Sequence, residues 1–336
     1  MKKKCCFIIP YFGKLPKNFS VFLKTCETNS DFDWLLLTDD SQKFIYPQNV
    51  KVKYTTLKDI SERAEQKFGF CVELEHAYKL CDFKPAYGFI FEEYIKDYEF
   101  WGHCDIDTIM GNLSHFLTDD VLQKYDKLFC MGHMVIYRNS NRNNRVFMKN
   151  YKGKELYKKV FTTPKICWFD EEWNGENNIN QIFLKEGKNV LIKDWSANFN
   201  VNKQNFVRNI FYEDKITGQV KHKSEKDIDA LYYWENGGAY RIYIKEGKLI
   251  KEEFLYMHFQ WRNMKFNKKI LGDNKFKIVP NSFLCIKKIP ITIEEFKKIR
   301  KKTICFYTFE RWIKNHITRR LKKITEIIFK DRMVKR

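Results

Sequence analysis

Two aspartates separated by one residue are the strongest chemical signal in this sequence of 336 residues. Asp105 and Asp107 follow an apolar stretch, residues 100–104, that predicts a buried strand. Two carboxylates at the end of a strand can share a hard divalent cation, which in turn neutralises a diphosphate leaving group. A solvated turn is the alternative. The aromatic run before the acids and the turn at residues 111–113 after them favour a metal site.

A histidine in the second half of the chain is a candidate for the third metal ligand. His258 lies in the apolar segment 255–261, and Arg262 and Lys265 follow it. An imidazole that completes a metal site, followed by two cations that hold phosphate, suits a nucleoside diphosphate. A histidine satisfied within the core is the alternative. Taken together with the two aspartates, the ligand interpretation is favoured.

An acidic and aromatic segment, residues 168–173 (WFDEEW), is a candidate for acid–base chemistry. A group transfer that inverts configuration needs one carboxylate to take the proton of the attacking hydroxyl. Aromatic neighbours can raise the pKa of a carboxylate by removing water from it. We therefore expect Asp170 or Glu171 to be the catalytic base. An acid-rich N-terminus of a helix is the alternative.

Short apolar runs that alternate with helical patterns predict the α/β sheet that positions these residues. Turn or acidic residues follow three predicted strands, at 5–9, 34–37 and 100–104. Because ligands of open α/β sheets bind beyond the carboxyl ends of strands, we expect these three ends to meet at one cleft. The other expected elements are strands at 50–54, 127–130, 134–137 and 190–192, helices at 57–68 and 177–186, and a hairpin over 240–256.

The composition indicates a globular protein, because 44% of the residues are hydrophobic and 17% are aromatic. The apolar run at the N-terminus is short, contains Pro10 and lacks a cleavage site, so we interpret it as a strand rather than a signal peptide. No stretch approaches the roughly 18 to 20 apolar residues that span a bilayer. The ten cysteines form no C-x-x-C pair, which argues against a zinc site or a disulfide framework and favours a reducing cytosol.

Positive charge is concentrated at the C-terminus. Residues 286–336 contain 17 Lys and Arg against 5 Asp and Glu, which gives +12 of the net charge of +20. Apolar residues, including Trp312, recur at helical spacing over 304–329. This pattern predicts a basic amphipathic helix that binds an anionic membrane surface, and a helix that packs on its own domain is the alternative. The expected domains are a catalytic domain over 1–285, with a nucleotide half over 1–135 and an acceptor half over 136–285, and a basic helical tail over 286–336.

Four segments carry a resemblance to a known family. They are residues 9–13 (IPYFG), 33–40 (DWLLLTDD), 84–88 (KPAYG) and 101–107 (WGHCDID). Together they resemble bacterial glycosyltransferases of capsule and cell-wall polysaccharides, which have the GT-A fold. The resemblance implies a fold class: a GT-A-like, Rossmann-like mixed α/β sheet flanked by helices, followed here by the basic amphipathic tail.

The resemblance also implies cofactors, substrates and site residues. The metal would be Mn²⁺ or Mg²⁺, the donor a UDP-hexose of the galactose type, and the acceptor a glycan that we expect to be lipid-linked. The enzyme would then be cytoplasmic and peripheral on the inner face of the plasma membrane. Independently of the resemblance, the aromatic residues of the acidic segment, from Trp168 to Trp173, are able to stack on sugar rings. The implied site residues are Asp105, Asp107 and His258 for the metal, Tyr11 and Asp39 for the nucleoside, and Lys84 together with Asp105 for the diphosphate.

Two other functions fit parts of the sequence. The positive charge and the many aromatic residues would suit a nucleic-acid-binding protein, but the charge is concentrated in the tail and no nucleic-acid motif is present. We therefore expect no nucleic-acid partner. A metal-dependent phosphotransferase or nuclease could use the same carboxylates, although the sequence has neither a P-loop nor a further cluster of acids.

Overall fold

The computed structural model describes residues 3–172, 177–200, 205–214, 220–260, 262 and 264–300. Within these ranges, no helix is long and apolar enough to cross a membrane. The nine cysteines in these ranges are all free thiols, as the sequence predicts. The amphipathic helix expected over 304–329 lies outside the described residues, so the membrane-binding tail stays a prediction.

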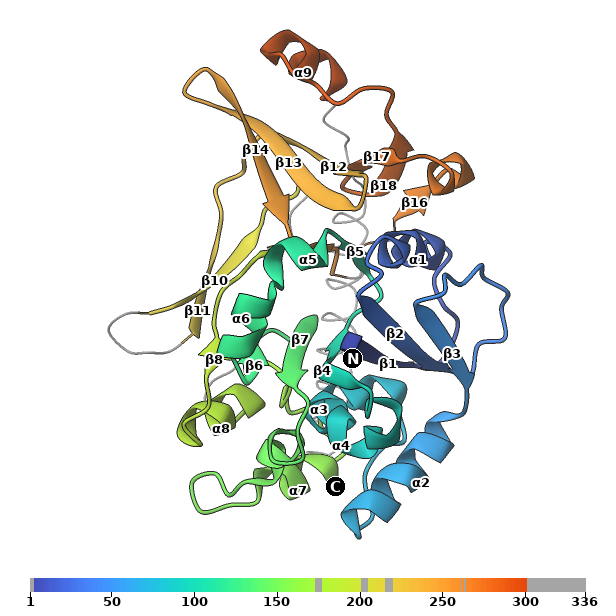
Figure 1. Ribbon diagram of the computed structural model, residues 1–336, viewed down its shortest axis with the longest axis vertical. Helices are drawn as coiled ribbons and strands as arrows, with labels where there is room; N and C mark the ends of the chain where they lie inside the picture. Colours follow the sequence, from blue (N-terminus) through green and yellow to red (C-terminus); the bar gives the residue numbers. More distant parts are fainter. Residues whose placement is uncertain are drawn as a thin grey trace, which may run out of the picture.

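A seven-stranded mixed sheet forms the centre of the molecule (Figure 1). In spatial order its strands are β3 (Val50–Tyr54), β2 (Phe32–Thr38), β1 (Lys3–Tyr11), β4 (Tyr98–Cys104), β7 (Met134–Arg138), β6 (Lys127–Leu128) and β8 (Val190–Leu191). The first four strands are mutually parallel, and β7 runs antiparallel to both of its neighbours. The carboxyl ends of β1, β2 and β4 therefore lie along one edge of the sheet.

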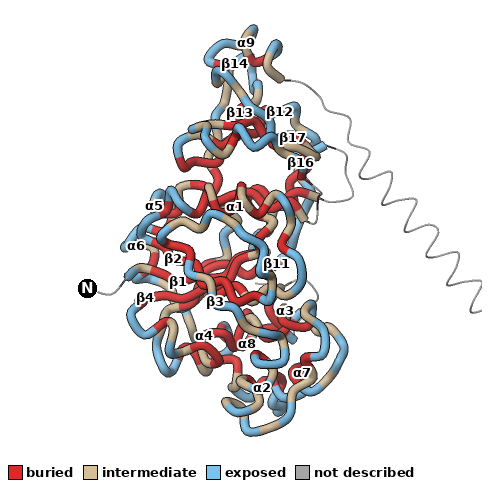
Figure 2. Tube along the Cα trace, turned by 90° about the vertical axis from the view of Figure 1, so that its right-hand side faces the viewer, coloured by how far each residue is buried: buried red, intermediate tan, exposed pale blue. Residues whose placement is uncertain are grey.

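Helices cover both faces of this sheet, because successive side chains of a strand point to opposite faces and here both sets are apolar. Phe7 and Ile9 of β1 pack toward one face, whereas Ile8 packs toward the other. The first face is covered by α1 (Phe19–Glu27), α5 (Leu113–Phe116) and α6 (Asp119–Lys124). The second is covered by α2 (Leu57–Phe68), α3 (Leu80–Phe83), α4 (Tyr87–Ile90), α7 (Leu156–Phe161) and α8 (Ile179–Lys185). Figure 2 shows the inner strands of this sheet, such as β1 and β2, buried between exposed helix surfaces.

A second, six-stranded sheet is built by the C-terminal part of the described chain (Figure 1). Its strands, in spatial order, are β14 (Lys248–Phe254), β13 (Gly238–Lys245), β12 (Ala230–Glu235), β17 (Lys275–Val279), β18 (Ser282–Cys285) and β16 (Lys265–Phe266). Phe296 of α9 (Ile293–Ile299) packs with Tyr233 and Ile242 on one face. The remaining short elements are the hairpin β10 (Asn209–Glu213) and β11 (Val220–Ser224), and the 3₁₀ helices η1 (Ala77–Lys79), η2 (Lys84–Ala86), η3 (Glu92–Tyr94), η4 (Asn143–Met148) and η5 (Lys268–Leu271).

A three-stranded sheet joins these two parts and brings together residues that are distant in the sequence. It consists of β5 (Thr108–Met110), β15 (Tyr256–His258) and β9 (Ser196–Asn198), with β15 in the middle. The strand β15 is antiparallel to β5 and parallel to β9, and His258 lies opposite both Thr108 and Asn198. Thr108 directly follows the two aspartates, so this pairing carries His258 to their turn.

The predicted fold class, a GT-A-like mixed α/β sheet flanked by helices, is confirmed for the described residues. The strand at 50–54 and the helix at 57–68 have the predicted bounds, and the hairpin over 240–256 is formed by β13 and β14. The three-stranded sheet and the partners of that hairpin, β12, β17, β18 and β16, were not predicted. The division of the chain at residues 135 and 285 stays a prediction.

Candidate functional site

A cluster of two carboxylates and one imidazole lies at the carboxyl end of β4. The Nε2 atom of His258 is 3.4 Å from Oδ1 of Asp107 and 3.9 Å from Oδ2 of Asp105. One ligand atom from each of these residues lies within 4.8 Å of the other two. Carboxylate oxygens and an imidazole nitrogen are ligands that Mn²⁺ takes readily, and carboxylates also suit Mg²⁺. The three residues predicted to bind the metal are thus brought together in an arrangement that fits such an ion.

The turn that carries the two aspartates is held by hydrogen bonds from three directions. The backbone N–H of Asp105 donates to the carbonyl of His133 at 3.0 Å. The hydroxyl of Thr108 donates to the carbonyl of Asp105 at 2.7 Å. The backbone N–H of Phe259 donates to the carbonyl of Asp107 at 3.0 Å, directly after β15. The positions of both carboxylates are therefore tied to β7 and to the three-stranded sheet.

The orientation of the imidazole is set by a residue that sequence reasoning missed. The Nδ1 atom of His258 lies 2.9 Å from the amide oxygen of Asn198, which also accepts a hydrogen bond from Gln260 at 3.0 Å. An amide oxygen can only accept, so Nδ1 carries the hydrogen and the lone pair of neutral imidazole is on Nε2. This is the atom that faces the two aspartates. No local pattern in the sequence distinguishes Asn198 from any other asparagine.

Neighbouring carboxylates control the protonation of His258. The side chain is 7% exposed, and burial lowers its pKa. The negative charges of Asp107 and Asp105 outweigh this effect, so that the pKa of His258 is raised above its ordinary value. Without a metal, a proton on Nε2 is therefore stabilised by the same carboxylates that would share a divalent ion with it.

Lys84 links the candidate metal-binding cluster to the predicted catalytic acids. Its Nζ atom donates to Oδ1 of Asp105 at 2.9 Å and to the carbonyl of Gly132 at 2.7 Å, and it lies 3.4 Å from Oδ2 of Asp170. Burial lowers the pKa of Lys84, but Asp105 and Asp170 raise it well above the ordinary value, so the amine stays charged. The residue predicted to face the diphosphate thus lies in the site as the shared counter-ion of two carboxylates.

Asp170 and Glu171 lie in a turn beside this lysine rather than at the N-terminus of a helix, because α8 begins only at Ile179. Asp170 is 3% exposed, and burial raises its pKa to about 7 although Lys84 opposes the shift. Burial also raises the pKa of Glu171, which is more exposed than Asp170. Both carboxylates therefore hold protons more tightly than free side chains do.

Gly132 allows the backbone to approach both acids closely. Its N–H donates to Oε2 of Glu171 at 3.2 Å. A Cβ atom at this position would lie 2.4 Å from Oδ2 of Asp170 and 3.1 Å from Oε2 of Glu171. Any larger residue would displace these carboxylates, so the site itself requires glycine here.

Tyr11 and Asp39 lie at the same edge of the sheet as the cluster. The Oδ1 atom of Asp39 accepts a hydrogen bond from the backbone N–H of Gly13 at 2.7 Å, which ties the loop after β1 to the end of β2. Burial raises the pKa of Tyr11, and the charge of Asp107 adds to this shift, so Tyr11 is within electrostatic reach of the aspartate. The ends of β1, β2 and β4 therefore meet as expected. Contact of these residues with a nucleoside stays a prediction.

Arg262 and Lys265 lie on the segment that follows β15. The buried guanidinium of Arg262 donates to the carbonyls of Asn200 at 3.0 Å and Pro280 at 3.3 Å. It also lies over the ring of Phe206, 5.4 Å from the ring centre. Lys265 is exposed at the start of β16. Arg262 therefore stabilises the local chain, and phosphate binding by either cation stays a prediction.

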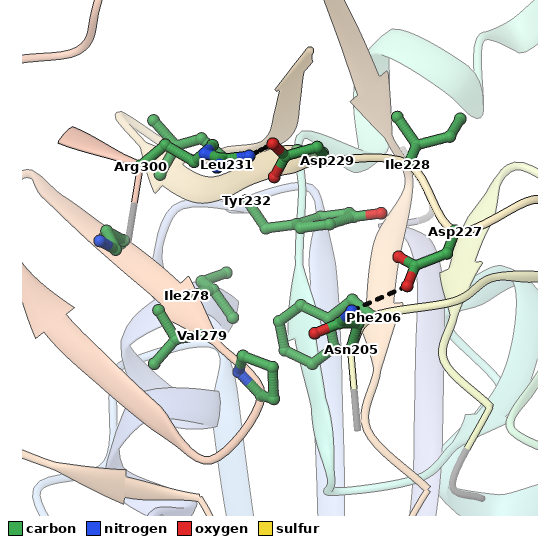
Figure 3. Close-up of a pocket in the computed structure, with 13 residues that line it drawn as sticks. Asn205, Phe206, Asp227, Ile228, Asp229, Leu231, Tyr232, Ile278, Val279 and Arg300 are labelled. Atoms are coloured by element: carbon green, nitrogen blue, oxygen red, sulfur yellow. Dashed lines mark hydrogen bonds and ion pairs between the residues drawn. The ribbon is translucent and has the colours of Figure 1, made fainter. Parts of the chain in front are cut away.

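A cavity of about 150 Å³ lies in the C-terminal part, between segments that include β12 and β17 (Figure 3). Its two carboxylates are engaged by neighbouring side chains, since Asp227 accepts a hydrogen bond from Asn205 at 2.7 Å and Asp229 pairs with Arg300. None of the metal-binding or acidic residues described above lines this cavity. We therefore place the candidate site at the carboxyl edge of the central sheet.

The chain belongs to a family of unknown function (DUF6625), whose model matches residues 7–287. No curated protein matches the sequence. Among solved structures, the chain is similar to the galactosyltransferase LgtC in complex with donor and acceptor sugar analogues. The identity is 11%, the alignment covers 58% of this chain and 75% of that chain, and the TM-score is 0.31. This likeness is distant, so the functional proposal depends on the residues of the site.

Proposed function

We propose that this protein is a metal-dependent glycosyltransferase that takes its sugar from a nucleoside diphosphate donor. The observation that supports the proposal most is the cluster of Asp105, Asp107 and His258 at the carboxyl edge of an α/β sheet, next to Lys84 and Asp170. A site of this kind offers ligands for a divalent metal ion. The ammonium group of Lys84 and the carboxylate of Asp170 lie beside those ligands.

The donor half of the reaction would be served by the cluster and by Lys84. Asp105, Asp107 and His258 would hold Mn²⁺ or Mg²⁺, and such an ion supplies positive charge that stabilises a diphosphate leaving group. Asn198 keeps Nε2 of His258 directed at this position. The ammonium group of Lys84, charged and 2.9 Å from Asp105, would bind a phosphate oxygen that enters beside that carboxylate.

The acceptor half of the reaction would be served by the acidic turn. An acceptor hydroxyl must lose its proton as it attacks the sugar, and a carboxylate with a pKa near 7 is well matched to this task at neutral pH. Asp170 has such a pKa, and Glu171 is the more exposed of the pair. We assign proton removal to these two carboxylates, with Glu171 nearer to solvent and Asp170 as its buried partner.

The substrates and the location follow from the sequence resemblance and the tail charge. The donor would be a UDP-hexose of the galactose type, and the acceptor a lipid-linked glycan of surface polysaccharide synthesis. The tail, with its net charge of +12, would hold the enzyme at the inner face of the plasma membrane. Tyr11 and Asp39 would contact the nucleoside from the ends of β1 and β2.

The decisive experiment measures release of UDP from a panel of UDP-sugars, with Mn²⁺ or with EDTA and without an acceptor. Slow hydrolysis of at least one donor that requires the metal is expected. As a matched control for acid substitutions in the cluster, Asp120→Asn changes an exposed carboxylate on α6 and should leave hydrolysis unchanged. Failure to turn over any nucleotide sugar, combined with phosphoryl transfer or nucleic-acid cleavage, would overturn the proposal in favour of a phosphotransferase or nuclease.

A further inference from the structure

We propose that Tyr78 and Trp168 form a subsite that binds a sugar ring of the acceptor, which extends the function proposed above. Both are large aromatic side chains that the fold leaves open to solvent, with exposed fractions of 55% for Tyr78 and 42% for Trp168. Most other aromatic residues of the described chain are buried. Exposed aromatic rings held next to candidate catalytic acids are a recognition surface for a ligand that has both apolar faces and hydroxyl groups.

A buried ion pair connects the segments that carry these two residues. The Nζ atom of Lys79, the residue after Tyr78, lies 2.7 Å from Oδ2 of Asp82, which has no exposed surface. The same amine donates to the carbonyl of Lys165 at 2.6 Å. The helix η1 and the loop before Asp170 are therefore joined through the buried ion pair of Lys79 and Asp82. Removal of either residue would leave the charge of the other uncompensated inside the protein.

The carboxylate of Asp82 also fixes the conformation of Trp168. The backbone N–H groups of Cys167 and Phe169, on either side of Trp168, donate to it at 2.9 Å and 3.0 Å. Trp168 itself has a φ of +52°, in the left-handed region that bulky residues rarely adopt. This clamp turns the indole outward while the next side chain, Phe169, is fully buried. A costly backbone conformation that exposes a tryptophan two residues before a candidate catalytic acid points to a functional role.

The subsite adjoins the carboxylates that would take the acceptor proton. The backbone N–H of Glu171 donates to the carbonyl of Trp168 at 3.5 Å, so the indole and the acids belong to the same turn. Tyr78 lies on the segment that Lys79 ties to the loop before Asp170. In agreement with this placement, the pKa of Tyr78 is raised by partial burial and by the negative charges of Cys81, Glu171 and Asp170. A sugar stacked on these rings would present its hydroxyl groups to that pair.

The position of the rings favours an acceptor sugar over the base of the donor. A nucleobase is also able to stack on aromatic rings, but the nucleoside is expected beside Tyr11 and Asp39, on the loops after β1 and β2. Tyr78 and Trp168 instead lie on segments that approach the site from the side of α3 and the acidic turn. A pyranose ring suits both the aromatic rings and the neighbouring carboxylates. Its C–H face stacks on an aromatic ring, and its hydroxyl groups reach the carboxylates.

The test is isothermal titration of the full-length protein with methyl glucopyranosides, methyl galactopyranosides, methyl N-acetylglucosaminides and lactose. We expect at least one of them to bind, and Trp168→Ala to weaken that binding by about tenfold, in line with the free energy of a single aromatic contact. Tyr78→Ala should weaken it as well, whereas Trp168→Phe should retain most of the affinity. As a control, Tyr54→Ala removes a tyrosine on β3 that is 59% exposed, and should change nothing.

Three results would overturn the inference: no binding of any pyranoside to the wild type, binding that both alanine variants leave unchanged, or a loss of UDP affinity in place of pyranoside affinity. The donor hydrolysis described above keeps the two proposals separate. If the wild type hydrolyses a UDP-sugar but binds no pyranoside, only the subsite is wrong. If it binds a pyranoside through Trp168 but hydrolyses no donor, the subsite stands as a glycan-binding site and the proposed transferase function falls.

Discussion

The amide oxygen of Asn198 lies 2.9 Å from Nδ1 of His258, and the two residues are direct neighbours in the parallel strands β9 and β15. The backbone pairing and the side-chain hydrogen bond therefore act on the same ring. Residues that orient a ligand in this way contribute strongly to metal affinity, although they do not touch the ion.

This relationship predicts graded effects of two substitutions on metal binding. His258→Ala removes a ligand and should weaken binding of Mn²⁺ and of UDP together, because the two are bound as one unit. Asn198→Ala leaves the ligand but not its orientation, and should lower Mn²⁺ affinity by about 10-fold to 100-fold. Titration of Mn²⁺ followed by electron paramagnetic resonance would measure both. If His258→Ala alters only the melting temperature, the histidine is a core residue.

Asp107→Asn is predicted to abolish metal-dependent turnover of the donor while the protein stays folded. The loss of one carboxylate from a site that offsets a diphosphate should remove several kcal/mol of transition-state stabilisation, or roughly a 10³-fold decrease in rate. The measurement is UDP release with saturating Mn²⁺, together with thermal unfolding. Turnover at the wild-type rate, or full activity of the wild type in EDTA, would contradict the assignment of the metal site.

The rate of transfer is predicted to rise with pH through about 7, because the pKa of Asp170 is raised from 3.8 to about 7 and a base must be ionised. Lys84→Met removes a charge that lowers this pKa, so the rise should move to higher pH. The same shift affects stability: the folded protein binds this proton more tightly than the unfolded chain, so the free energy of unfolding should fall as the pH rises from about 4 to 7. A flat profile of kcat/KM over this range would exclude Asp170.

Gly132→Ala is predicted to impair transfer, because the added methyl group would lie 2.4 Å from Oδ2 of Asp170. The expected cost in stability is about 1 to 3 kcal/mol, typical of overpacking at a tight position. Gly272→Ala is the matched control, since its nearest neighbour would be 3.8 Å away and its φ is negative. The measurement compares kcat and the melting temperature of the two variants. Equal values for Gly132→Ala and Gly272→Ala would show that Asp170 and Glu171 move aside freely.

Truncation after Thr303 is predicted to release the protein from anionic vesicles and to spare donor hydrolysis. Each Lys or Arg near an anionic surface contributes about 1 kcal/mol, and this attraction decays within about 10 Å at 0.1 M salt. Co-sedimentation with neutral and anionic liposomes at low and high salt would measure the effect. If the shortened protein unfolds, or still binds vesicles as before, the tail is a structural element.

Local signals in the sequence were sufficient where one segment determines its own conformation. The helix α2 has the predicted bounds because Thr56 and Asp59 form a capping box at its start and Gly69 adopts a φ of +75° at its end. The turn with Asp105 and Asp107 was likewise predictable, because a buried apolar strand ends at the first of them. The hairpin of β13 and β14 was predicted from the glycine at its turn.

Other parts of the site depend on contacts that only the tertiary structure makes. Lys79 and Asp82 look like ordinary surface charges of a short helical segment, yet they form a buried pair that holds the acidic turn. Arg262 follows His258 closely in the sequence, but the chain bends after β15. At this bend the backbone N–H of Arg262 donates to the carbonyl of Phe259 at 3.2 Å. The buried contacts of its guanidinium with the carbonyls of Asn200 and Pro280 could not be predicted from the local sequence.

The three-stranded sheet of β5, β15 and β9 has a consequence for how the protein is made. A growing chain that has emerged only as far as β8 already contains both aspartates but lacks Asn198 and His258. The central sheet can form from this portion, whereas closing the long loops that bring β15 between β5 and β9 must wait for the later chain. The candidate metal site would then be completed late in biogenesis. In the mature protein, detachment of β15 would separate His258 from the two aspartates and would also remove Tyr256 from the hydrophobic core on one face of the central sheet.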